Sequence, residues 1–195
     1  MDERFAAAVA ALDAANGADP FRLRFQGVEH PKELLHAELL TAWIRRLVPD
    51  PGAELLLAAR AHHLRRWERP RADYPAGRHG YLRWRRDAHG WHAEIAEPIL
   101  RVAGYDEETV KRTANLIAKR VQGDDPEGQT MEDGLCLVFL ETQLDELAGK
   151  LDREKMIDIL RKSWAKMSAV ARELALGLAF SPSEFDLVRE ALGQE

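Results

Sequence analysis

Apolar residues recur along the chain at spacings of three and four, which is the pattern of amphipathic helices. There is no convincing run of alternating β-branched residues, and residues that start or stop helices occur throughout. We therefore expect an all-α fold, a single helical bundle of about seven to nine helices over residues 1–195, with the segment 150–195 packing on the rest. Helices are predicted at about 3–15, 31–48, 52–67, 89–103, 107–121, 131–148 and 153–179, and a short last helix after the capping box Ser181–Glu184.

Two segments interrupt this pattern. Residues 68–80 contain Pro70, Pro75, Gly77 and Gly80, so we expect an extended loop there, and the sequence QGDDPEGQ at 122–129 predicts another. By contrast, the sequence LCLVFL at 135–140 is apolar on every side. The helix that carries it should therefore lie deep in the core.

Composition excludes several classes of protein. A chain of 195 residues can form a full apolar core without a disulfide or a structural metal. Cys136 is the only cysteine, which excludes an intramolecular disulfide and favours a reducing, cytoplasmic location. The longest apolar run, 5–12, is far shorter than a membrane span and follows the acidic Asp2 and Glu3, so it predicts a helix rather than a secretory signal.

The net charge of -5 conceals a strongly basic segment. Residues 60–86 hold nine arginines against two acidic residues, a local sum of +7, which leaves -12 for the rest of the chain. An acidic chain is a poor nonspecific nucleic-acid binder, whereas clustered arginines suit a small anion such as a phosphate ester. The alternative is that these arginines pair with acidic helices elsewhere. The aromatic residues of the same region either stack on a ligand or pack the loop: Trp67, Tyr74, Tyr81, Trp84 and Trp91.

Several ionisable residues fall on apolar helix faces. His36 lies at the centre of an apolar stripe, the adjacent His62 and His63 border the buried face of the next helix, and His92 lies between apolar residues of a later one. Asp133 shares a face with the leucines of the most apolar helix. A buried carboxylate or imidazole needs a hydrogen bond, a counter-charge or a metal.

Each of these residues also has a structural interpretation. A buried histidine commonly donates to a carbonyl, and Asp133 follows Thr130 at the spacing of a capping box. His89 stands beside Gly90 at an expected helix start, which predicts a surface residue. Cys136 is expected to pack in the core, because nothing nearby in the sequence would lower its pKa.

The order His36, then His62-His63, then Asp133 resembles the H…HD…D motif of the HD superfamily, over roughly residues 30–145. The strings HHLRRWERPRADYPAGRHGYLRWRR (62–86) and MEDGLCLVFLE (131–141) are also similar to an uncharacterised domain-of-unknown-function family of bacteria and fungi with an HD-like arrangement. The superfamily resemblance implies a helical bundle with a divalent metal on the four motif residues, and most characterised members hydrolyse phosphate esters. The second family brings no established activity.

One departure from the superfamily motif affects the expected metal. His63 stands where the motif has aspartate, so the resemblance implies a ligand set of His36, His62, His63 and Asp133. Three imidazoles and one carboxylate favour Fe, Zn, Mn, Co or Ni over Mg. Such a site either activates water for hydrolysis or retains only the metal.

The leading hypothesis is metal-dependent hydrolysis of a small phosphorylated metabolite or nucleotide. His92 is then a second-metal ligand or a general acid, with Asp133 as the catalytic carboxylate on the metal. The expected contacts to the anion are Arg66, Arg69, Arg71, Arg78, His79 and Lys119. The alternatives are an HD-like iron oxygenase or another non-phosphate metalloenzyme, and a non-catalytic protein whose arginine segment docks an anionic partner. The sequence leaves the substrate and the oligomeric state open.

Overall fold

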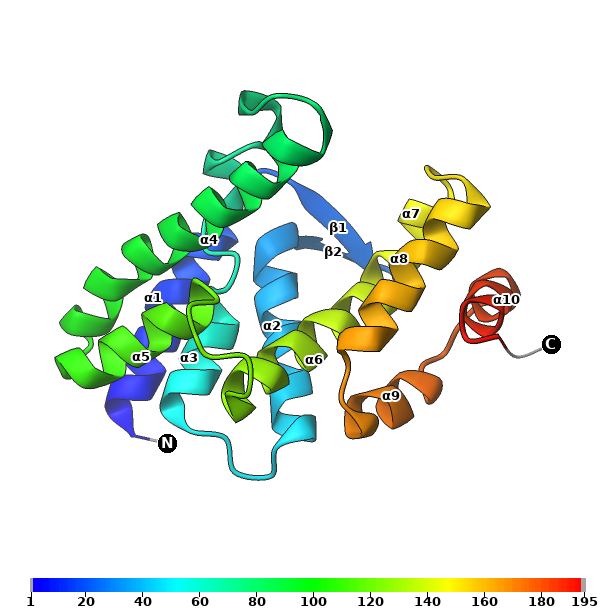
Figure 1. Cartoon of the computed structure of the whole chain (residues 1–195). Coiled ribbons are helices and arrows are strands. Elements are labelled where there is room, and N and C mark those ends of the chain that lie inside the picture. The colour runs from blue at the N-terminus through cyan, green and yellow to red at the C-terminus, as the bar shows by residue number, and fades with distance from the viewer. Residues whose placement is uncertain (1, 194–195) are drawn as a thin grey trace. The chain divides into compact units, whose positions relative to one another are not determined.

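The computed structural model describes residues 2–193 and confirms the all-α class (Figure 1). Within these residues the chain forms ten α-helices and one short two-stranded hairpin. They divide into two compact units, the first ending at Gly128 and the second beginning at Gln129.

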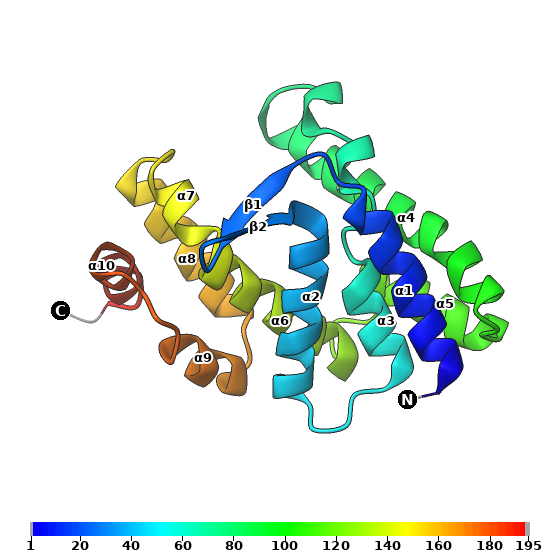
Figure 2. The same ribbon diagram turned by 180° about the vertical axis from the view of Figure 1, so that it is seen from behind.

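The first unit is built around helix α3, whose residues are almost all buried. Helices α1, α2, α4 and α5 each contact α3, and α4 also runs along α5 (Figures 1 and 2). Apart from Glu54 and Arg60, α3 consists of alanine and leucine, which allows its neighbours to approach closely. The elements of this unit are α1 (Glu3–Gly17), β1 (Arg22–Phe25), β2 (Val28–Pro31), α2 (Lys32–Leu47), α3 (Ala53–Ala61), 3-10 turns at Arg66–Glu68 and Arg71–Asp73, α4 (Gly77–Val102) and α5 (Glu107–Ile117).

The second unit contains most of α6 and the helices that follow it. As expected, the apolar centre of α6 is buried, with Leu137 fully enclosed. Helices α7, α8 and α10 pack on one another, and α10 opens with the predicted capping box between Ser181 and Glu184. The elements are α6 (Pro126–Thr142), α7 (Leu144–Ala148), α8 (Arg153–Lys166), α9 (Ala169–Leu176) and α10 (Pro182–Ala191).

The β1–β2 hairpin was not predicted from the sequence. Its strands are antiparallel, Arg22 faces Pro31, and the turn residues Gln26 and Gly27 both have positive φ. That backbone suits a two-residue hairpin turn. Alternation of apolar and polar residues does not reveal these strands, because each is four residues long and carries charged side chains. Pro31 ends β2, so α2 begins one residue later than predicted.

The largest disagreement concerns residues 62–88. The third helix ends at Ala61 rather than near Trp67, because Arg65 adopts a left-handed backbone with φ 50°. Helix α4 begins at Gly77, well before residue 89, so the predicted loop is shorter and contains two 3-10 turns. The glycines that indicated a loop are part of the first turn of α4.

Two predicted helices are each divided in the structure. The expected helix 131–148 is interrupted at Gln143, and the expected helix 153–179 is interrupted after Lys166. Ser168 provides the second break, because its hydroxyl accepts a hydrogen bond from the amide of Ala171 and starts α9. These two divisions explain why there are ten α-helices in residues 2–193.

In the described part of the chain, no helix combines the length and the apolar character that crossing a membrane requires.

We predict that Gly80→Ala destabilises the protein. A Cβ at Gly80 would lie 1.9 Å from the carbonyl oxygen of Pro75, a backbone atom that cannot move without displacing the start of α4. Overpacking of this kind costs about 1–3 kcal/mol. Thermal denaturation should show a lowered Tm for Gly80→Ala, whereas Gly17→Ala should not destabilise, because no atom lies within 4 Å of the added methyl. Equal Tm values for the two variants would contradict the prediction.

Candidate functional site

Five histidines from three segments of the first unit form one cluster. The ring of His63 lies 4.1 Å from that of His36 and 4.8 Å from that of His62, measured between ring centres. On the α4 side, His89 is 5.5 Å from His62, and His92 is 6.0 Å from His63. The cluster therefore contains His36, His62, His63 and His92 of the sequence prediction.

His89 is the member that the sequence analysis placed wrongly. It was expected at the surface at the start of a helix, but it lies halfway along α4 and is partly buried. Because α4 begins at Gly77, His89 and His92 occupy the same helix face three residues apart. The shared spacing with His92 was the signal that could have identified it.

The end of α3 brings two histidines to the cluster together. His62 and His63 follow the last helical residue, Ala61, so helical geometry no longer separates their side chains. His62 is 2% exposed, and the ring of His63 stacks between those of its neighbours. On a continuing helix the two side chains would diverge by about 100°.

Two polar residues that the sequence analysis missed hold this region in place. Asn16 at the end of α1 accepts a hydrogen bond from the Arg65 amide, at 3.0 Å, and its amide nitrogen lies 3.5 Å from the Glu33 carbonyl oxygen. Asp19 accepts a hydrogen bond from the Glu33 amide, at 2.9 Å. Both Asn16 and Asp19 are 1% exposed. They connect α1 to the first turn of α2 and to the turn after α3.

Hydrogen bonds fix the tautomers of two histidines. The Nδ1 of His92 lies 2.7 Å from the Leu64 carbonyl oxygen, which can only accept, so this nitrogen carries the proton. The Nδ1 of His63 lies 3.0 Å from a carboxylate oxygen of Glu33, which assigns the proton to this nitrogen, and Arg66 contacts both ring nitrogens of His63. In both rings Nε2 therefore carries a lone pair. Pairing one ring nitrogen with a carbonyl or a carboxylate is the usual way in which metal-ligating histidines are oriented.

Burial keeps the imidazoles neutral. It lowers the pKa of His36 and of His89 to about 3 and that of His92 to about 4. The pKa values of His62 and His63 also lie well below the usual value, again mainly because of burial. Burial raises the pKa of Glu33 to about 7, against the effect of nearby Arg66. Neutral imidazoles are the form that binds metals.

Three ring nitrogens of the cluster are buried without a hydrogen-bond partner among the described residues 2–193: Nε2 of His36, Nδ1 of His62 and Nε2 of His92. An unsatisfied buried polar atom costs about 1–3 kcal/mol, and such atoms are rare in native proteins. Three in one cluster indicate a site that takes up a metal, a ligand or ordered water.

The spacing of the rings suits a shared metal, but their orientation does not. Two imidazoles on one tetrahedral metal have ring centres roughly 5 Å apart, at metal–nitrogen distances of about 2.1 Å. The rings of His36 and His63, however, are inclined by only 16° and stacked, so their nitrogens do not point to a common centre. Accordingly, residues 2–193 contain no group of three or more His, Cys, Asp or Glu side chains already arranged to hold a metal ion.

Asp133 belongs to the second unit and is 4% exposed. Its Oδ1 accepts hydrogen bonds from the Ser168 amide, at 2.8 Å, and from the side-chain amide of Gln129, at 3.0 Å. The capping-box interpretation with Thr130 is wrong, because α6 begins at Pro126 and Asp133 lies inside it. Its expected role as a metal ligand stays a prediction.

The expected anion-binding residues lie in different surroundings. Arg66 is half-buried beside His63 and over the Trp84 ring, and Lys119 is close enough to lower the pKa of His62 by its charge. Arg71 donates to backbone carbonyls of its own loop. Arg69, Arg78 and His79 are exposed.

Other members of the arginine segment form local pairs. Arg65 contacts Glu68, while Arg83 and Arg86 contact Asp87. Buried Trp84 donates to the Arg69 carbonyl, at 2.8 Å, and so packs the loop onto α4. Ion pairing therefore accounts for some of these arginines, anion binding by the segment stays a prediction, and the Arg66 guanidinium reaches the histidines.

Comparison with known proteins places the chain in a family without giving it an activity. Searches of curated proteins and of solved structures found no match. A family model described as a domain of unknown function, DUF4202, matches residues 6–188, which include both the histidine cluster and Asp133. The match covers nearly the whole sequence, and the chain therefore belongs to the DUF4202 family.

Proposed function

We propose that the protein is a metal-dependent phosphohydrolase whose metal is held by the buried histidine cluster. The observation that carries this proposal is the set of three buried, unpartnered imidazole nitrogens on His36, His62 and His92. The H…HH…D order shared with the HD superfamily supports the same chemistry. The imidazole donors suit Fe, Zn, Mn, Co or Ni.

Metal binding as proposed here would require His63 to move. His63 is stacked on His36 and contacts Arg66 through Nε2, so its ring has to turn before it can join the other histidines as a ligand. The same turn releases Arg66 from His63. A guanidinium at this position then becomes available to a phosphate group, which it can bind through two parallel hydrogen bonds.

The other residues of the cluster have separate tasks in this proposal. A divalent metal would polarise a phosphoryl oxygen and lower the pKa of water. His92 has its proton on Nδ1, bound to Leu64, and its low pKa keeps Nε2 unprotonated, so it suits a metal ligand rather than a general acid. Glu33 orients His63 through Nδ1. Lys119 adds positive charge on the His62 side.

A second candidate function has one observation in its favour. The cluster contains five imidazoles and, through Glu33, one carboxylate in contact with them. Histidine-rich sites with few carboxylates also suit iron, so an oxygenase is the alternative. Iron in the purified protein, with dioxygen consumption and no hydrolysis of any phosphate ester, would favour it.

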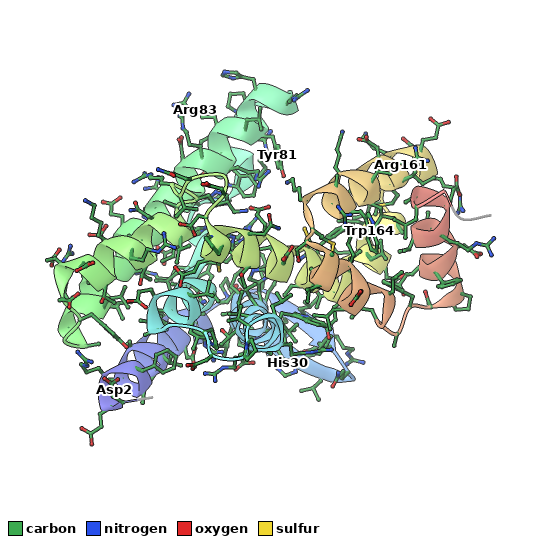
Figure 3. The ribbon with its side chains drawn as sticks, turned by 60° about the horizontal axis from the view of Figure 1, so that its bottom comes forward. Asp2, His30, Tyr81, Arg83, Arg161 and Trp164 are labelled. Atoms are coloured by element: carbon green, nitrogen blue, oxygen red, sulfur yellow. The ribbon has the colours of Figure 1, made fainter. Side chains whose placement is uncertain are left out.

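We predict that the purified protein contains about one transition-metal ion per chain. Elemental analysis of folded His36→Ala and His62→Ala should show that most of this metal is lost, because each variant removes a buried donor atom. His30→Ala is the matched control, since this histidine lies on β2 in the hairpin, outside the cluster (Figure 3). Chelation should lower the Tm of the wild type and leave that of His36→Ala unchanged.

The proposed metal centre would be contradicted if the wild-type protein held no metal after purification and took up none when incubated with each candidate metal. Ordered water would then be the partner of the three ring nitrogens. The same measurement on Asp133→Asn tests the oxygen ligand that the sequence predicts. Metal retained at the wild-type level in this variant would confine the ligands to the histidines.

We further predict that Arg66→Gln lowers kcat/KM for p-nitrophenyl phosphate by about tenfold to a hundredfold. The variant removes the charge-assisted hydrogen bonds to the phosphate, which contribute about 1.5–3 kcal/mol. Arg66→Lys should recover part of the loss, since it restores the charge but not the fork. Arg24→Gln, which changes an exposed arginine of β1, is the control and should match the wild type. Equal values for Arg66→Gln and the control would rule out Arg66 as an anion contact.

A further inference from the structure

The face of α4 that carries Trp91 borders a second possible binding site. A groove of about 900 Å³ lies along α4 and α5, lined by residues of both helices and by Arg69 and Tyr74 of the preceding loop. The two helices run side by side over this length (Figure 1). The volume falls within the range of sites that take small organic ligands. The five clustered histidines are not among the residues that line it.

The groove carries unbalanced positive charge. Arg69, Lys111 and Arg120 line it without a carboxylate partner in residues 2–193. The other two lining arginines are each held by neighbouring carboxylates. Glu94 is the one lining carboxylate that has no such partner within the same residues. Because Arg101 is paired with two of the lining carboxylates, the five basic and four acidic groups of the lining leave a surplus of one positive charge, which attracts an anion.

Two of the unpaired guanidiniums lie against neighbouring residues of α4, Gly90 and Trp91. Arg69 lies over the Trp91 ring, 5.2 Å from its centre, and its backbone is held by the hydrogen bond from Trp84. The guanidinium of Arg120 lies beside Gly90, the residue before Trp91. Its Nη2 is 3.2 Å from the position that a Cβ on Gly90 would occupy. The absence of a side chain at Gly90 thus gives Arg120 access to the surface of α4. The result is an indole with a guanidinium over its ring and another beside its backbone.

We propose that this groove binds a mononucleotide, with the phosphate between Arg69 and Arg120 and the base against the aromatic residues Trp91 and Tyr74. A phosphate monoester carries a charge of about -1.5 to -2 near neutral pH, and the positive surplus of the groove attracts it. Arginine is the side chain best suited to hold a phosphate through paired hydrogen bonds. A planar base gains contact area on an indole or a phenol ring. The site is distinct from the histidine cluster and needs no metal.

The test is calorimetric titration of the full-length protein with AMP. We expect Arg69→Gln and Arg120→Gln each to weaken AMP binding by about tenfold or more, because each removes charge-assisted hydrogen bonds. Arg83→Gln is the control, since Arg83 projects from the same helix but does not line the groove, and it should bind AMP as the wild type does (Figure 3). Adenosine and ribose 5-phosphate should each bind at least tenfold more weakly than AMP, because each lacks one of the two recognised groups.

Several results would overturn the proposal. The first is that AMP does not bind. The second is that adenosine or ribose 5-phosphate binds as tightly as AMP. The third is that Arg83→Gln loses as much AMP affinity as Arg69→Gln and Arg120→Gln. Folded His36→Ala and chelated wild type should both retain the AMP affinity. Loss of affinity in either would assign the nucleotide to the histidine cluster instead. A wild-type protein that takes up none of the candidate metals and still binds AMP would refute the metal centre and leave the groove intact, so the two proposals fail separately.

Discussion

Burial of neutral imidazoles is the constraint on which the centre of the first unit depends. Each of the five rings has its centre 4.1–6.3 Å from that of a neighbouring ring. They cannot all carry charge, because protonation of each ring would be opposed by desolvation and by repulsion from the other charged rings. Burial lowers all five pKa values, and the rings stack as neutral aromatic groups. The consequence is a set of lone pairs in a region with few hydrogen-bond donors. Within residues 2–193, three of the ring nitrogens have no hydrogen-bond partner.

Polar residues outside the cluster keep this arrangement in place. Asn16 and Asp19 lie near the end of α1, yet they bind the backbone at Glu33 and at Arg65, on either side of the histidines. They also satisfy backbone groups that would otherwise be buried without partners. Because Arg65 has a left-handed backbone, the chain turns immediately after His62 and His63. The helix end, rather than a helix face, therefore brings the two adjacent histidines into one site.

Helix α4 contributes to two chemically different environments. One face carries His89 and His92 into the cluster, where burial keeps them uncharged. Another face borders the groove with Trp91, where arginines lie in the open. The ring of Trp91 is 5.6 Å from that of His92, so a single helix turn separates the neutral region from the basic one. Desolvation governs the first environment and Coulomb attraction governs the second.

The sequence by itself determined the all-α class, the buried centre of α6, the capping box at Ser181 and the inward positions of His36 and His92, because each follows from local periodicity or capping chemistry. It did not determine that His89 faces the cluster or that His62 and His63 lie at a helix end, since both depend on where α3 stops and α4 starts. Those boundaries are set by the left-handed Arg65 and by the close contact of Gly80 with Pro75. The roles of Asn16 and Asp19 were decided by the tertiary structure alone, because the backbone groups they bind are 14 to 49 residues away in the chain.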